Sequence, residues 1–210
     1  MPVKLSRPDE LPEGFLYRED FLSQSEEAEL LRKFAALDFV AYDYHGFLAK
    51  RRTVRYGMNY DINTRAANES ALPIPEFLMN LRERAANFAE VPPDALVQAL
   101  VSEYSAGTPI GWHRDTPQFG TIIGISLAGA CRMRLKPYHA NRGKASRTPA
   151  LESVASKNKI LSVRLEPRSI YVLRGAARSH WQHSIPAVDE LRYSITFRTL
   201  RSNSERGSAA

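Results

Sequence analysis

The second half of the chain is a series of short segments rich in β-branched and aromatic residues, and this pattern restricts the possible folds more than any other feature. Glycine, proline or polar residues separate the segments, which are ALVQALVSEYS, FGTIIGISLAG, CRMRLKP, KILSVRLE, RSIYVLRG and LRYSITFRTL. Segments of this length and composition predict β-strands joined by turns and loops.

Two helices are predicted before these strands. In SQSEEAELLRKFAAL, either Ser23 or Ser25 can cap the helix, glutamates follow in its first turn, and apolar residues recur at helical spacing. The second helix begins near Pro75, in PEFLMNLRERAANFAEV, and Pro92 with Pro93 ends it. Helices followed by many short strands indicate an α+β fold in which the helices pack on a β-sandwich or jelly roll.

The predicted elements form a single domain over residues 13–200, because no repeat and no linker divides them. Residues 1–12 are polar and contain proline, so we expect a flexible lead-in. Residues 201–210, RSNSERGSAA, have the composition of a disordered tail. The polar stretch at residues 138–158 is long for a loop in a compact domain, and its role stays open.

Composition excludes several classes of protein. Hydrophobic residues make up 43% of the chain and charged residues 25%, as in soluble globular proteins. We expect no membrane span, no secretory signal and, with Cys131 as the single cysteine, no internal disulfide, which together predict a cytoplasmic protein. The net charge of +6 is compatible with a nucleic-acid partner, although many proteins with such a charge bind none.

The string HRD at residues 113–115 also opens the catalytic loop of protein kinases. That family needs a glycine-rich loop over the phosphates, a lysine on its third strand and a later DFG, and this chain has none of them. The kinase interpretation is therefore rejected.

A metal site is the second interpretation of the same residues. Side chains at positions i and i+2 of a strand point the same way, so His113 and Asp115 would project together if WHRD ends a strand. An imidazole and a carboxylate are two of the three ligands in the facial triad of non-heme Fe(II) oxygenases. The pair alone is weak evidence, since a polar turn explains it equally well. The histidines that could complete the site are His45, His139, His180 and His183.

The last predicted strand, LRYSITFRTL, has an unusual polar face. Strand alternation places on one side Arg192, Ser194, Thr196 and Arg198. Two arginines on an inward face are costly in an ordinary core, and a bound dicarboxylate would account for them because guanidinium groups pair with carboxylates. A solvated face would account for them as well.

Together the HxD pair, a later histidine and the RxxxxxR ending resemble the AlkB family of Fe(II)- and 2-oxoglutarate-dependent dioxygenases. The resemblance runs from about Pro12 to Leu200, and its most specific parts are RYSITFR and VSEYSAGTPIGWHRD. It implies a double-stranded β-helix (jelly-roll) core with supporting N-terminal helices and a substrate-recognition lid. It also implies Fe(II) as the metal, 2-oxoglutarate as co-substrate and O2.

The resemblance assigns the iron ligands to His113, Asp115 and His183. His183 is preferred to His180 because it directly precedes the SIP stretch, as in the family pattern.

For the co-substrate, the resemblance implies that Arg192 binds the distal carboxylate of 2-oxoglutarate and that Arg198 lies at the metal end, near Asp115. Tyr104 matches a tyrosine that bonds the co-substrate. Three smaller residues complete the predicted pocket, namely Ser194, Thr196 and Ser102. The family often has asparagine at the last of these positions.

The family's lid over a flipped nucleotide corresponds to residues 42–61, YDYHGFLAKRRTVRYGMNYD. Cations for phosphates and aromatic rings for stacking are the usual needs of base flipping and single-strand binding. The candidate substrate contacts are Arg51, Arg52, Tyr44, Tyr56 and Tyr60. Some of these tyrosines can equally be core residues.

We therefore expect an oxidative demethylase of N-alkylated bases in DNA or RNA, which releases formaldehyde, succinate and CO2. DNA-repair members of the family carry an acidic residue just after HxD, whereas this chain has Thr116 and Pro117. Hydroxylation of a tRNA base, or demethylation of a protein side chain, is thus the alternative. A non-catalytic nucleic-acid-binding jelly roll is a third hypothesis. The expected partner is alkylated single-stranded DNA or RNA, and the expected state is a monomer.

Overall fold

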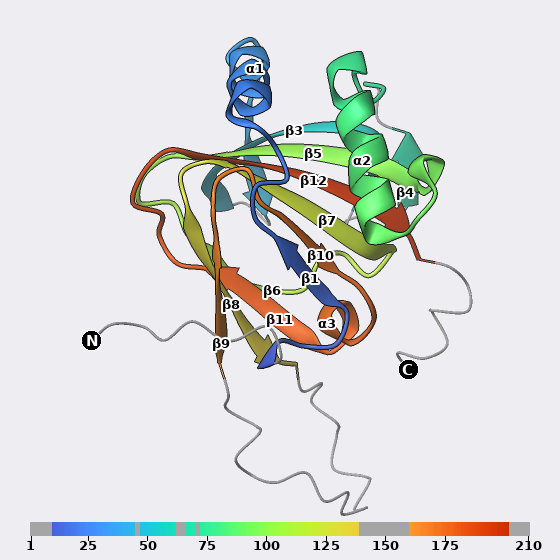
Figure 1. Ribbon diagram of the computed structural model, residues 1–210, viewed down its shortest axis with the longest axis vertical. Coiled ribbons are helices and arrows are strands. Elements are labelled where there is room, and N and C mark those ends of the chain that lie inside the picture. Colours follow the sequence, from blue (N-terminus) through green and yellow to red (C-terminus); the bar gives the residue numbers. More distant parts are fainter. Residues whose placement is uncertain (1–9, 45–46, 62–65, 70–71, 139–159, 202–210) are drawn as a thin grey trace, which may run out of the picture.

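The computed structural model describes residues 10–44, 47–61, 66–69, 72–138 and 160–201 (Figure 1). Side chains are described for the same residues except 42–44, 47–49, 59–61 and 66–69. The predicted tail lies outside the described residues beyond residue 201, as do most of the predicted lead-in and of the polar stretch at residues 138–158.

The two longer helices of the described structure lie in the first half of the chain, and strands dominate the second half. In chain order they are β1 (Phe15–Arg18), α1 (Gln24–Phe34), β2 (Val40–Tyr44), β3 (Phe47–Asp61), β4 (Ala66–Glu69), η2 (Glu76–Leu78), α2 (Met79–Ala89), η3 (Pro93–Ala95), β5 (Leu96–Tyr104), β6 (Ile110–His113), β7 (Phe119–Ala128), β8 (Cys131–Pro137), β9 (Leu161–Leu165), β10 (Ile170–Leu173), α3 (Gly175–Ser179), β11 (Trp181–Ile185) and β12 (Arg192–Leu200). Both predicted helices and all six strands predicted in the second half are present.

The strands form two antiparallel sheets that face each other. The larger sheet has the order β1-β10-β7-β12-β5-β3-β2, with β4 paired to β3, and the smaller sheet has the order β6-β11-β8-β9. From β5 to β12 successive strands alternate between the larger and the smaller sheet, except that β8 and β9 both lie in the smaller sheet; this is the double-stranded β-helix, or jelly-roll, arrangement. The predicted α+β jelly roll is confirmed.

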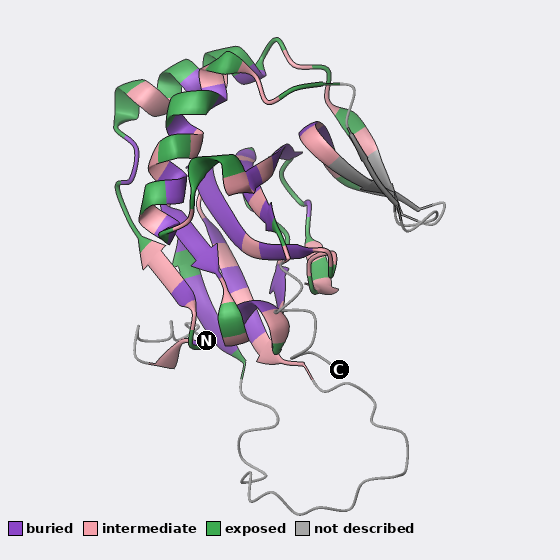
Figure 2. Ribbon diagram, turned by 90° about the vertical axis from the view of Figure 1, so that its right-hand side faces the viewer, coloured by how far each residue is buried: buried purple, intermediate pink, exposed green. Residues whose placement is uncertain are grey.

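The helices cover the outer face of the larger sheet (Figure 1). Helix α1 begins at a capping box, in which the Ser23 hydroxyl accepts from the Glu26 backbone N–H and the Glu26 carboxylate accepts from the Ser23 backbone N–H. Phe34 at its end packs with Ile195 and Phe197, the outward residues of β12. Burial follows the same pattern, with buried residues concentrated on the strands below the helices (Figure 2).

A second apolar cluster fills the space between the two sheets. It joins residues of the larger sheet, such as Ile122 and Leu173, to residues of the smaller sheet, such as Met133 and Leu135. This layer leaves polar side chains of β5, β6, β11 and β12 at one side of the space between the sheets, and these side chains form the site described below.

The stretch predicted as a lid, residues 42–61, forms β-strands in the described structure. β2 and β3 pair with each other, and β3 continues the larger sheet by pairing with β5. No helix among the described residues is long and apolar enough to cross a membrane.

Candidate metal centre and co-substrate pocket

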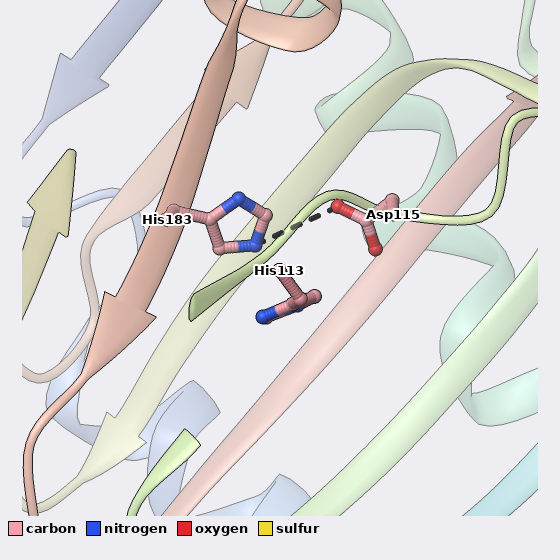
Figure 3. A group of neighbouring side chains, drawn as sticks. All are labelled: His113, Asp115 and His183. Carbon is pink, nitrogen blue, oxygen red and sulfur yellow. Dashed lines mark ion pairs between the residues drawn. The ribbon is translucent and has the colours of Figure 1, made fainter. Parts of the chain in front are cut away.

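Three side chains meet on the inner face of the smaller sheet. His113 ends β6 and lies directly opposite His183 of the neighbouring strand β11. Asp115 follows two residues after His113, so its carboxylate projects to the same side. The ligand atoms of His113, Asp115 and His183 all lie within 4.8 Å of one another, and the residues come from two segments far apart in the sequence (Figure 3). His180, the other nearby histidine of the sequence, is exposed at the end of α3 and outside this group.

Each imidazole has a ring nitrogen within reach of the other ligand atoms of the group. The Nδ1 atom of His113 lies 2.9 Å from the Gly111 carbonyl oxygen. Because a carbonyl only accepts hydrogen bonds, Nδ1 carries the proton and Nε2 keeps its lone pair. Burial, together with the nearby imidazole of His113, lowers the pKa of His183 to about 3.

The carboxylate of the group is ionised. Burial alone would raise the pKa of Asp115, but the Arg198 guanidinium holds it well below its usual range. Arg198 Nη2 lies 3.1 Å from Asp115 Oδ1, and His183 Nε2 lies 3.7 Å from Asp115 Oδ2. Two imidazoles and one carboxylate form the donor set that suits Fe(II) with open coordination positions, so the residues present fit this metal.

Arg178 of α3 holds the segment that follows Asp115. Its Nη2 donates to the carbonyl oxygens of Asp115, Thr116 and Phe119, at 3.1, 2.8 and 3.0 Å. The side chain is buried and fixes the backbone on which one ligand sits. Sequence reasoning missed Arg178, although its position five residues before His183, in an otherwise apolar helix, was a usable signal.

Arg192, the first residue of β12, is the second marked feature of the site. Its exposed fraction is 1%, and the buried Nε and Nη1 atoms have no hydrogen-bond partner among the described residues. The guanidinium lies 4.9 Å from the centre of the Tyr104 ring. A buried cation with two free donor nitrogens fits a carboxylate ligand, since such a charge is costly unless it is paired.

Small polar side chains line the sheet between Arg192 and Arg198. Ser194 and Thr196 lie between them on the inward face of β12, and Ser102 stands opposite Ser194 on β5. All three are buried, and Ser194 Oγ lies 3.4 Å from the Tyr104 hydroxyl. Burial would raise the pKa of Tyr104, but Arg51 and Arg192 outweigh it and lower the pKa. The positive charge therefore extends from the pocket to β3.

Tyr171 of β10 also reaches this pocket and was not found from the sequence. A Cβ atom at Gly124 would lie 2.2 Å from Tyr171 Cζ, so the missing side chain of Gly124 makes room for the end of the tyrosine ring. Gly124 is paired with Thr196, which lies between Arg192 and Arg198 on β12. Burial, followed by the charge of Asp115, raises the pKa of Tyr171, which keeps its hydroxyl neutral.

The predicted substrate contacts whose side chains are described lie on two opposite faces of β3. Arg52 faces the helices, where it pairs with Glu103 at 2.6 Å, and Tyr56 is buried in the core under the helices. Arg51 lies on the opposite face of β3, toward Tyr104. The side chains of Tyr44 and Tyr60 lie outside the described part of the chain.

Comparison with known proteins gives one family. Residues 14–198 match the model described as the 2OG-Fe(II) oxygenase superfamily. The chain is 32% identical over 211 residues to the alkylated DNA repair protein ALKBH8 homolog of Arabidopsis thaliana, covering 96% of this chain and 59% of that protein. The chain thus spans little more than half the length of this relative.

Two further relatives extend the comparison. The chain is 28% identical over 206 residues to the uncharacterized protein L905 of Acanthamoeba polyphaga mimivirus, covering 89% of this chain and 85% of that one. The structure of OsALKBH1 superposes with a TM-score of 0.67 at 16% identity, over 90% of this chain and 99% of the other. This last likeness shows the fold.

Proposed function

The chain belongs to the 2OG-Fe(II) oxygenase superfamily, and from this premise we propose that it removes N-alkyl groups from the bases of nucleic acid by oxidation. As a member of this family it is an AlkB-like dioxygenase that depends on Fe(II), 2-oxoglutarate and O2. The observation that carries the proposal is the buried guanidinium of Arg192, whose Nε and Nη1 have no hydrogen-bond partner among the described residues, in the same pocket as His113, Asp115 and His183.

When bound, Fe(II) would supply the oxidation of an N-methyl group by O2, coupled to the decarboxylation of 2-oxoglutarate to succinate and CO2. The hydroxylated methyl group would leave as formaldehyde, and the nitrogen of the base would be left without its methyl group. The residues of the chain have simpler tasks. His113, Asp115 and His183 would hold the metal, and Arg192 would pair with the distal carboxylate of 2-oxoglutarate.

The remaining side chains order this pocket. The charge of Arg198 keeps Asp115 ionised. Arg198 Nη1 also donates to Gln98 Oε1 at 2.6 Å, and this bond holds the guanidinium in place. Tyr104, Ser194 and Ser102 would orient the co-substrate along β12, with Thr196 beside them. The apolar layer between the sheets excludes water from one side of the pocket.

Nucleic acid is the favoured substrate class for two reasons. The chain carries a net charge of +6, and Arg51 and Arg55 stand on the face of β3 that continues the pocket. One relative bears the name alkylated DNA repair protein. Thr116 and Pro117, where DNA-repair members carry an acid, favour the alternative of a tRNA base that is hydroxylated or a protein side chain that is demethylated.

The test is succinate formation by the Fe(II)-loaded protein with 2-oxoglutarate, with and without single-stranded oligonucleotides that contain 1-methyladenine or 3-methylcytosine. We expect the methylated oligonucleotide to stimulate succinate formation and to lose its methyl group by mass, and His183→Ala to abolish both. Succinate formation that no oligonucleotide stimulates would reject alkylated single-stranded oligonucleotides as the substrate and leave tRNA and protein side chains to be assayed in the same way.

A further inference from the structure

The outer face of the smaller sheet carries a cluster of cations that the proposed reaction does not use. We propose that this face binds the phosphodiester backbone of the single-stranded nucleic acid whose base enters the pocket. The inference rests on the proposed function and adds to it a second contact surface, here called the cationic face. Its members are Trp112, Arg132, Arg134, Lys136 and Arg164.

Strand alternation produces this face. On β8 the odd-numbered residues Met133 and Leu135 point into the apolar layer between the sheets. Arg132, Arg134 and Lys136 therefore point outward. Every outward residue of β8 between Cys131 and Pro137 is thus a cation.

The neighbours of these cations on the adjacent strands are not acids. Arg132 lies directly opposite Arg164 of β9, although like charges in cross-strand positions are destabilising. Arg134 lies opposite Ser162 and Ser184, and Lys136 lies opposite Gln182. Within the described residues, no carboxylate forms an ion pair with Arg132, Arg134 or Lys136.

Among the described residues, one acid contacts the cationic face, and it leaves most of the charge in place. Glu166, at the end of β9, pairs with Arg164, which is the most exposed member of the face. The three cations of β8 keep their full charge. Arg132 and Arg164 repel each other, and no described acid pairs with the cations of β8. A surface with this charge distribution is suited to an anionic ligand.

Trp112 fixes two of the cations in the middle of the face. The Arg134 guanidinium lies 5.0 Å and the Lys136 ammonium 4.4 Å from the Trp112 ring. Arg134 Nε also donates to Ser184 Oγ at 3.0 Å. These contacts order the cations before a ligand arrives, which lowers the entropy lost on binding.

The cationic face lies back to back with the metal ligands. On β11, Gln182 and Ser184 point outward on either side of His183, which points inward. On the edge strand β6, Trp112 points outward immediately before His113. A nucleic-acid strand whose base is held on the inner side could therefore cross the edge at β6 and continue over Trp112 and Lys136.

A phosphodiester backbone is the occupant that this chemistry selects. Its charges repeat along the strand, as the outward cations repeat along β8, and it requires no apolar groove. The face offers cations and one aromatic ring, and no hydrophobic pocket for the anchors of a protein partner.

The experiment compares two double variants. Arg132→Gln/Lys136→Gln removes two charges from the cationic face and leaves Arg134 with its bond to Ser184. Arg32→Gln/Lys33→Gln removes two charges from exposed positions in the last turn of α1, on the other side of the molecule. The affinity of each protein for an unmodified single-stranded oligonucleotide of about 15 nucleotides is measured by fluorescence anisotropy at several salt concentrations.

We expect the first variant to bind roughly 10-fold more weakly than the wild type, with a salt dependence shallower by about 1.4, and the second variant to bind as the wild type does. Arg132→Lys/Lys136→Arg keeps both charges and should retain the affinity, which separates loss of charge from loss of packing. Equal binding by the wild type and the first variant, or no binding by the wild type, would overturn the proposal. Poly-glutamate is tested as a second ligand in the same assay. If the first variant binds poly-glutamate more weakly than the wild type but binds the oligonucleotide equally well, the face is a site for acidic protein segments and the proposal is overturned.

Turnover of a trinucleotide with one methylated base separates this inference from the proposed function. The trinucleotide fills the pocket without reaching the cationic face, so the wild type and the first variant should demethylate it equally well. Wild-type protein that leaves the trinucleotide methylated would count against the proposed function, whatever the oligonucleotide binding shows.

Discussion

Arg192 shows at the scale of one residue how the site depends on a ligand. A guanidinium with an exposed fraction of 1% and two unpartnered nitrogens costs the empty protein free energy. On the proposed function, the carboxylate of 2-oxoglutarate would offset this cost when it binds. The residue therefore contributes to function at the expense of the stability of the ligand-free protein.

Arg192→Met is accordingly expected to leave the free energy of unfolding of the metal-free protein unchanged or to raise it by about 1–4 kcal/mol. Calorimetry of the two proteins without ligands measures this. Phe197→Ala, which opens a cavity under the helices, serves as the comparison and should cost about 3–5 kcal/mol. A loss as large as this in Arg192→Met would show that protein contacts already satisfy the guanidinium.

Arg178→Met should weaken metal binding by roughly 10- to 100-fold, because the three carbonyl groups that position Asp115 lose their donor. The affinity for Mn(II) or Fe(II) can be measured by titration without oxygen. Arg174→Met is a matched control, since Arg174 bonds to Glu90 and to the Ala89 carbonyl instead. Equal metal affinity in both variants would mean that Asp115 needs no support from α3.

The residues of the site differ in how far the sequence predicts them. Strand alternation places His113 with Asp115, and Arg192 with Arg198, so local spacing is sufficient for these pairs. Arg178 acts through loop carbonyls that are distant in sequence. Tyr171 enters the pocket because Gly124, on another strand, has no side chain. Contacts of this kind depend on register between strands, which local pattern does not encode.

Alternation also explains why two predicted substrate contacts are separated from the site. Within β3, odd-numbered residues such as Arg51 face the pocket, whereas Arg52 and Tyr56 face the helices. The composition of residues 42–61 indicated a recognition surface, but it carried no information on which side of the sheet each residue would lie.

At the scale of elements, the sequence located helices and central strands well. The six strands of the second half are apolar and bounded by turn residues, so their pattern is strong. β3 was not predicted as a strand, because its KRRTVRYG core is half cations and lacks a regular alternation of apolar with polar residues. β11 was also not predicted, because its five residues, WQHSI, give too short a pattern.

The sequence left open whether Ser23 or Ser25 caps α1, and the structure shows that it is Ser23. Ser23→Ala should lower the free energy of unfolding by about 1 kcal/mol, because Ser23 accepts the Glu26 N–H in the capping box. Ser25→Ala should cost less, since Ser25 contacts only the Ser23 hydroxyl, at 3.0 Å. Urea unfolding of both variants checks the order, and succinate formation should be unchanged in both. A larger effect at Ser25 would mean that Ser25, two residues later, caps the helix instead of Ser23.

At the scale of the whole molecule, the site joins the two sheets. The metal-binding group belongs to the smaller sheet, whereas Arg192 and Arg198 belong to the larger one. A ligand held by both groups crosses the apolar layer between the sheets. The general fold was predictable from the strand pattern, but the assignment of each strand to a sheet requires the register that the structure supplies.

Binding of metal and 2-oxoglutarate should therefore raise the stability of the entire domain. At a ligand concentration 100 times the dissociation constant, each ligand adds about 2.7 kcal/mol. Thermal unfolding without oxygen should show one transition that moves upward with Fe(II) and further with 2-oxoglutarate. His183→Ala should show neither shift. A second transition that does not respond to the ligands would indicate that the helices unfold independently of the sheets.

The central claim is that Arg192 and the three-residue metal group hold one dicarboxylate between them, and calorimetric titration of the Fe(II)-loaded protein with 2-oxoglutarate in the absence of oxygen tests it directly. The wild type should bind one equivalent, and Arg192→Met should bind about 30-fold or more weakly, because a buried charged hydrogen-bonded pair is lost. Pyruvate, which lacks the distal carboxylate, should bind both proteins equally. Equal affinity of the two proteins for 2-oxoglutarate would contradict the claim.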